Sequence, residues 1–210
     1  MVVKTLTEQH RSTNSRGYRK TKRAEDEQRT RARIVDATEE LHGTIGPART
    51  SVSAVADRAG VTRATVYRHF PDDESLFLAC SGQWLSRQRL PDPQTWPAKD
   101  TPGETLGVGL HDIYRYYREG QSMLIRVLLD ADVVPERVRN ARIESERRWQ
   151  EALLAAVPGR RRTAVRAAVA HACAFGTWRS LVLDIGLTDR AAVDLMVGMV
   201  MTAATPLPSS

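Results

Sequence analysis

The stretch TSVSAVADRAGVTRATVYRHF, from Thr50 to Phe70, decides the fold of the first part of this chain. Its apolar residues recur at helical spacing and predict a short helix whose inward stripe is Val52, Val55, Ala56 and Ala59. Thr50 precedes the stripe, and its hydroxyl is expected to cap the helix by accepting a free backbone N–H. Gly60 is expected to end the helix, because a positive φ costs glycine nothing.

A second short helix is predicted directly after this glycine. Thr62 is its expected N-cap, and Val66 and Phe70 are its expected inward residues. The other side chains are expected to face outward: Arg63, Thr65, Tyr67, Arg68 and His69. Two short helices across a glycine-containing turn predict a helix-turn-helix, whose second helix enters the major groove of DNA.

The positive charge of the chain is concentrated in the same region. The net charge is +6; residues 1–70 hold 14 Lys and Arg against 8 Asp and Glu, whereas residues 71–210 hold 17 of each. All of the excess positive charge therefore belongs to the part with the helix-turn-helix. A basic N-terminal region, which we call the head, on a neutral remainder, the body, suits phosphate binding, because neutralised phosphates release their counterions.

The segment AGVTRATVYRHFPDDESLF resembles the recognition segment of the TetR family of bacterial transcriptional regulators. The matching features are the Ala-Gly-Val corner, Thr65, the Tyr67–His69 pair, Phe70 and the acidic cap before Leu-Phe, within about Ile34–Ala79. The resemblance implies an all-α protein with an N-terminal three-helix head and a C-terminal helical body for ligand binding and dimerisation. It also implies a homodimer that binds a pseudo-palindromic operator.

The predicted recognition helix carries the chemistry of a DNA reader. Arg63 can bind guanine O6 and N7 in bidentate fashion, and Ala64 and Thr65 can contact thymine methyls or the backbone. The remaining candidates suit phosphate contacts: Thr50, Ser51, Thr62, Tyr67, Arg68 and His69. The alternative is that Tyr67 packs inside the head and that His69 only caps the helix.

Three parts are predicted along the chain: a flexible basic arm over 1–24, the DNA-binding domain over 25–71, and a regulatory and dimerisation domain over 72–210. The arm is either a solvated tail or a segment that follows DNA phosphates. Asp73 stands where many TetR-like proteins have a phosphate-binding Lys, so the resemblance implies that this anchor is lost or replaced by the arm.

The rest of the chain reads as helices separated by Pro and Gly. The predicted helices are a fourth one from the Asp72 cap to about Leu90, then Glu104–Glu119, Ser122–Asp132, Pro135–Val157, Arg161–Ile185 and Thr188–Ala204. The segments Ala164–Gly176 and Ala191–Thr202 are apolar nearly all round, so both of their sides must be covered. We expect a second copy of the chain to cover one side, in a twofold four-helix interface.

The body is also expected to hold a small-molecule effector, as the resemblance implies. Aromatic side chains with a few polar groups suit such a site. The candidates are Trp84, His111, Tyr114, Tyr117, Met123, Trp149, His171, Phe175 and Trp178. For each of them, an ordinary place in the core is an equally good interpretation.

Other functions find little support in the sequence. The histidines lack metal spacing, and no nucleophile elbow, Walker loop or dinucleotide fingerprint is present, so we expect no enzyme, cofactor or metal site. Cys80 and Cys173 are expected to be buried thiols. Without a leader or a run of about 20 apolar residues, we expect a cytoplasmic protein with no membrane association.

We therefore predict a ligand-responsive repressor; the alternative is an architectural DNA-binding protein without an effector.

Overall fold

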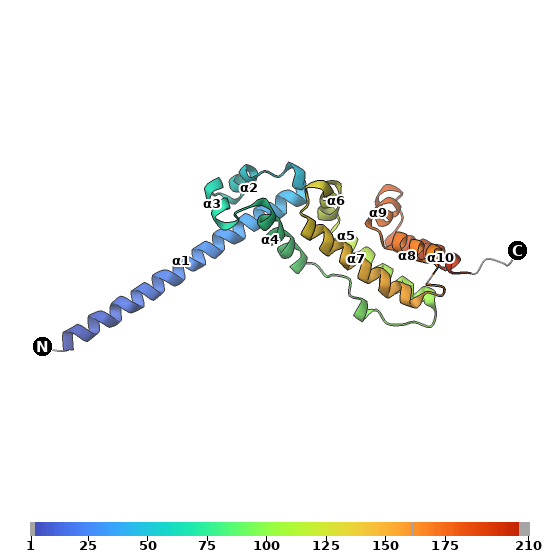
Figure 1. Ribbon diagram of the computed structural model, residues 1–210, viewed down its shortest axis with the longest axis horizontal. Coiled ribbons are helices and arrows are strands. Elements are labelled where there is room, and N and C mark those ends of the chain that lie inside the picture. The colour runs from blue at the N-terminus through green and yellow to red at the C-terminus, as the bar shows by residue number, and fades with distance from the viewer. Residues whose placement is uncertain (1–2, 161, 206–210) are drawn as a thin grey trace. The chain divides into compact units, whose positions relative to one another are not determined.

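The computed structural model describes residues 3–160 and 162–205, and within those ranges the secondary structure is helical without strands. The predicted all-α class is confirmed. The chain divides into two compact units with the boundary between Gln83 and Trp84, inside helix α4 (Asp73–Ser86). Figure 1 labels the helices of both units. The division into three parts at residues 24 and 71 stays a prediction.

The first unit is built on α1 (Val3–Thr44), followed by the 3-10 turn η1 (Pro47–Arg49), α2 (Val52–Ala59), α3 (Arg63–His69) and most of α4. Its core gathers apolar side chains from each of these four α-helices, among them Ile34, Val55, Val66, Phe70 and Cys80. The inward residues predicted for α2 and α3 are thus in the core, except that Val52 is only partly buried. The head has the expected helix-turn-helix.

Helix α1 begins well before residue 25, the predicted start of the DNA-binding domain. The helix begins at Val3, although a flexible arm was predicted over residues 1–24. Residues 3–24 contain no proline, and α1 continues through a charged stretch with the pair Arg23–Glu27 one turn apart, an arrangement that supports isolated helices. At the other end α1 runs past Gly43 to Thr44, and Gly46 makes the turn with φ 90°.

The second unit consists of the rest of the chain. Its elements are the 3-10 turn η2 (Pro93–Thr95), α5 (Pro102–Glu119), α6 (Gln121–Leu129), η3 (Ala131–Val133), α7 (Glu136–Ala156), α8 (Thr163–Cys173), α9 (Phe175–Trp178), the π-helical turn η4 (Arg179–Asp184) and α10 (Asp189–Ala204). Helix α5 is central, because α7, α8, α9 and α10 all pack against it. Its residues Leu106, Leu110, Ile113 and Tyr114 are fully buried.

Two predicted helices of this unit are shorter or interrupted. The fourth helix ends at Ser86, not near Leu90, and Leu85 and Leu90 are exposed. The continuous helix predicted over Arg161–Ile185 is wrong, because Ala174 adopts an extended backbone between α8 and α9. The first residue of α10 agrees with the prediction, because Thr188 caps this helix by accepting the N–H of Ala191.

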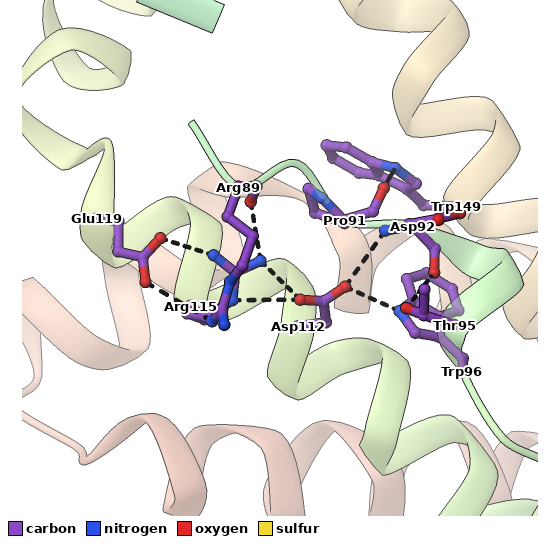
Figure 2. A network of polar contacts seen from close by, with 9 residues as sticks. All are labelled: Arg89, Pro91, Asp92, Thr95, Trp96, Asp112, Arg115, Glu119 and Trp149. Atoms are coloured by element: carbon purple, nitrogen blue, oxygen red, sulfur yellow. Dashed lines mark hydrogen bonds and ion pairs between the residues drawn. The ribbon is translucent and has the colours of Figure 1, made fainter. Parts of the chain in front are cut away.

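The proline-rich segment before α5 is held against α5 and α7 by a polar network (Figure 2). The Asp112 carboxylate accepts hydrogen bonds from Trp96 Nε1 at 2.9 Å, from the backbone N–H of Asp92 and from Arg115. Arg115 also donates to the carbonyl oxygen of Arg89, and Trp149 donates to that of Pro91. Burial alone raises the pKa of Asp112, but these hydrogen bonds outweigh it and leave the pKa below its usual value.

Candidate nucleic-acid interface

The start of α3 is fixed by its own hydroxyl groups. Thr62 Oγ1 accepts the backbone N–H of Thr65 at 3.2 Å, and the two threonine hydroxyls lie 3.0 Å apart. This cap satisfies one of the free N–H groups of the first turn and was predicted from the sequence. It leaves Arg63 and Ala64 exposed at the beginning of the helix, which is where a recognition helix contacts base edges.

The turn before α3 is held by a residue that the sequence analysis missed. Gly60 ends α2 with φ 63°, as predicted, and the N–H of Val61 returns to Ala56 O. Arg33 of α1 donates to the carbonyl oxygens of Ala59 and Gly60, at 3.1 Å from Nε and 2.9 Å from an Nη. A charged donor thus binds the free carbonyls at the end of α2 and ties the turn to α1. No local sequence pattern signals this contact, which joins residues 26 and 27 positions apart.

The cap of α2 is Ser51, and the prediction of Thr50 was wrong. The Ser51 hydroxyl accepts the N–H of Ala54 at 3.1 Å, whereas the Thr50 hydroxyl donates to Gly46 O at 2.8 Å. Both residue types can cap a helix, so the register of the cap depends on where the 3-10 turn η1 ends. Ser51 remains exposed and Thr50 is half-buried.

The other predicted DNA contacts lie on the outer side of α3. Arg63, Ala64, Tyr67 and Arg68 are exposed, and Thr65 is half-buried. Tyr67 is 43% exposed, which rules out the alternative that it packs inside the head. These positions are compatible with DNA contact, and the contacts themselves stay predictions.

His69 has a different environment at the end of α3. Its Nε2 is buried without a hydrogen-bond partner among the described residues. Burial lowers the pKa of His69, and the neighbouring Arg68 lowers it further, while Glu27 raises it. A neutral imidazole is a donor through one nitrogen only. The lowered pKa therefore favours the neutral imidazole in the protein without DNA.

Asp73, the residue that departs from the TetR-like pattern, is exposed to solvent. It lies in the first turn of α4, next to Glu74. The cap of that turn is Asp72, as predicted, whose Oδ1 accepts the N–H of Ser75 at 2.7 Å. Negative charge here favours the helix dipole but would repel a phosphate.

In the second unit, most of the predicted effector-binding residues form one aromatic cluster. Tyr117 lies at its centre, with ring centroids 5.2 Å from Phe175, 6.0 Å from Trp178 and 6.5 Å from Trp149. Tyr114 adjoins Tyr117, and the half-buried Trp84 packs on Tyr116. Met123 is buried, but His111 and His171 are exposed and are not part of this cluster.

The hydroxyls of Tyr114 and Tyr117 and the indole N–H of Trp178 have partners within the protein. Tyr114 donates to Ala172 O at 3.0 Å, Tyr117 donates to Cys173 O at 2.6 Å, and Trp178 donates to Asp189 at 2.9 Å. Burial raises the pKa of both tyrosines, so their hydroxyls stay protonated and act as donors. An effector that binds here must therefore compete with existing hydrogen bonds.

The described residues indicate neither a metal site nor a membrane-spanning helix. Within the described part of the chain, no three His, Cys, Asp or Glu side chains are grouped to hold a metal ion. None of the helices described is long and apolar enough to cross a membrane. Cys80 and Cys173 are buried free thiols, as predicted, and burial raises the pKa of each to about 12.

Comparison with known proteins connects the first unit to a family. Residues 34–80 match the family described as bacterial regulatory proteins, tetR family. The regulator TtgR of Pseudomonas putida is 43% identical over 55 residues, which are 26% of either chain. The repressor KstR of Mycobacterium tuberculosis is 34% identical over 83 residues, 40% of this chain and 38% of KstR. The matched part is thus well under half the length of these relatives.

Two solved structures share the fold over most of the chain. A TetR-like regulator from Rhodococcus sp. RHA1 has a TM-score of 0.57 at 18% identity and covers 81% of this chain and 93% of its own. The multidrug binding protein EbrR, complexed with imidazole, has a TM-score of 0.51 at 24% identity, with 86% and 92% covered. The chain therefore shares the fold of these TetR-like structures, and its residues 34–80 match the tetR family of bacterial regulatory proteins. The two relatives are named as transcriptional regulators or repressors, not as enzymes, in line with the prediction.

Proposed function

We propose that this protein is a cytoplasmic, ligand-responsive transcriptional repressor that binds a pseudo-palindromic operator as a homodimer. The observation that carries the DNA-binding part is α3 itself, which is capped, exposed and fastened to α1 through Arg33. Rigid placement matters because base contacts require a fixed register on the duplex. In such a dimer the two α3 helices would bind half-sites about 34–36 Å apart, one turn of DNA.

Arg63 and Arg68 have separate roles in this proposal. Arg63, in the first turn of α3, reads guanine, and Arg68, in its last turn, contacts a phosphate. Loss of a bidentate base contact costs about 1–3 kcal/mol and relaxes specificity, whereas loss of a phosphate contact weakens all sequences alike and reduces the salt dependence.

Gel shifts with the promoter of its own gene and neighbouring genes test this assignment. Arg63→Ala should reduce the preference for the operator over random DNA by roughly 5–150-fold, and Arg68→Ala should leave that preference nearly unchanged. Equal loss of operator preference in the two variants would refute the division of roles. Binding scattered over the genome without an operator would instead favour the architectural alternative.

Dimerisation through α8 and α10 is the second part of the proposal. Ala164 and Ala167 on α8 and Gly198 on α10 are exposed, and Leu195 is 50% exposed on α10. Small residues allow helices to approach closely, and an exposed apolar face that contains them suits a twofold contact.

Leu195→Glu should convert the dimer to a monomer in light scattering, while Arg190→Glu, on the same helix, should not. A dimer that survives Leu195→Glu would move the interface elsewhere.

The effector is proposed to bind at the aromatic cluster around Tyr117. Large aromatic side chains with a few hydrogen-bonding groups are typical of sites for drug-sized molecules. EbrR, which shares the fold, is named as a multidrug binding protein. A ligand that prefers one conformation of the body would change DNA affinity by population shift. Tryptophan fluorescence during titration with a panel of planar aromatic compounds would detect it, because Trp149 and Trp178 lie in the cluster.

A further inference from the structure

The interruption between α8 and α9 is not dictated by the local sequence. Ala174 has φ −71° and ψ 135°, so the helix stops after Cys173 and starts again at Phe175. Residues 163–178 contain no proline, and apart from Gly176 they are rich in alanine, the residue with the highest helix propensity. The local sequence therefore favours a single helix, and contacts from elsewhere must favour the break.

Two tyrosines of α5 supply those contacts. In an unbroken α-helix the carbonyl of Ala172 would accept the N–H of Gly176, and the carbonyl of Cys173 would accept that of Thr177. In the structure these two carbonyls accept the hydroxyls of Tyr114 and Tyr117, at 3.0 and 2.6 Å. The N–H of Thr177 bonds to Ala174 O. The phenol hydroxyls therefore take the places of two backbone amides.

Because these hydrogen bonds are buried, they contribute strongly to whether the helix is broken or continuous. Tyr114 and Tyr117 are 0% and 2% exposed, so water cannot replace a lost partner. A buried polar group without a partner is costly. Each carbonyl needs at least one of these donors, and the extended backbone at Ala174 keeps the two amides away, so an arrangement with neither donor in place is disfavoured. The π-helical turn η4, which begins directly after α9, holds an extra residue per turn and can absorb a change in helical register.

We propose that residues 172–178 are a two-state element in which the Tyr114 and Tyr117 hydroxyls compete with the Gly176 and Thr177 amides for the same two carbonyls. The broken arrangement is the one described here. In the continuous arrangement α8 runs into α9, and both hydroxyls turn to an acceptor carried by a bound small molecule. This inference rests on the proposed ligand response and specifies which groups change partner.

Four variants separate the two arrangements. The double variant Tyr114→Phe/Tyr117→Phe removes the hydroxyls, and Gly176→Ala raises helix propensity; each should favour the continuous helix. A Cβ at Gly176 would meet no described atom within 4 Å, so Gly176→Ala also fits the broken arrangement. Ala174→Pro suits φ −71° but disrupts a helix interior, so it should hold the segment broken, at some cost in stability because it removes the N–H that bonds to His171 O. Tyr116→Phe, in the same aromatic cluster, is the control.

Amide hydrogen exchange at position 176 measures the outcome directly. The double variant and Gly176→Ala should each slow exchange at this amide at least about tenfold in protection factor relative to the wild type. Tyr116→Phe should match the wild type, and Ala174→Pro should exchange no more slowly than it. Unchanged protection in both the double variant and Gly176→Ala would overturn the two-state element. Gly176→Ala keeps this test valid if the double variant fails to fold.

Operator affinity of the same proteins tests the link to function. Gly176→Ala and Ala174→Pro should shift the affinity for DNA in opposite directions from the wild type. Changed exchange with unchanged affinity would overturn the regulatory role of the element and leave DNA binding intact. If the wild type itself binds no operator, the proposed function fails, and the exchange data still decide whether the two arrangements exist.

Discussion

Arg33 of α1 donates a hydrogen bond to the carbonyl oxygen of Gly60, at 2.9 Å, and a second to that of Ala59. One side chain thus fixes the turn that sets the angle between α2 and α3. Charge-assisted hydrogen bonds are about twice as strong as neutral ones, and carbonyls at a helix end otherwise depend on water. The position of α3 therefore depends on a residue that lies outside the helix-turn-helix sequence.

Replacement of Arg33 by Ala should therefore lower the free energy of unfolding by about 1.5–3 kcal/mol. Arg58→Ala is the control, because Arg58 forms an exposed ion pair with Glu40 that should contribute about 0–1 kcal/mol. Urea unfolding followed by circular dichroism measures both. If the two variants lose the same stability, the hydrogen bonds of Arg33 do not hold the turn.

Ser51→Ala should destabilise the first unit by about 1 kcal/mol, because the free N–H of Ala54 loses its cap. Ser53→Ala, at an exposed position inside α2, is the matched control and should be neutral or slightly stabilising. Thermal unfolding of the two variants compares them directly. A larger effect from Ser53→Ala would contradict the cap assignment.

Asp73→Lys should raise DNA affinity and steepen its salt dependence, since a phosphate repulsion is replaced by an attraction. The same change in charge at Asp100, exposed in the segment before α5, should have a much smaller effect. Loss of a favourable helix-dipole interaction should cost the Asp73 variant about 0.3–1 kcal/mol of stability. Filter binding over a salt series measures the slope, and equal slopes for the two variants would exclude Asp73 from the DNA-facing surface.

Asp112→Asn should destabilise the protein by about 1–3 kcal/mol at pH 7, because the charged acceptor of Trp96 and Arg115 is lost. The lowered pKa of Asp112 means that its charged form stabilises the fold above the ordinary carboxylate pKa. This contribution is lost as the pH falls through the lowered pKa, so the difference from wild type should shrink below about pH 4. Urea unfolding at several pH values tests this, with Asp100→Asn as a control that should show no such trend.

The helix-turn-helix was predictable because its determinants are local. The caps at Thr62 and Asp72, the positive φ of Gly60 and the inward stripe ending at Phe70 each involve neighbours within one or two turns. The cap of α2 was placed one residue early, because Thr50 and Ser51 are both suitable and the preceding 3-10 turn decides between them. The exposure of Tyr67 and the partial burial of His69 depended on the packing of α3 against the rest of the unit.

The sequence by itself determined the all-α class, the order of the helices and the position of the basic head, because helical periodicity, capping and charge are written in adjacent residues. Only the tertiary structure decided that Arg33 holds the turn at Gly60 and that α8 breaks at Ala174. In both places a buried or partly buried carbonyl accepts a hydrogen bond from a side chain that is far away in the sequence: Ala59 from Arg33, and Cys173 from Tyr117. Local propensity carries no information about such partners, and a hydrogen bond shielded from water is strong enough to override it.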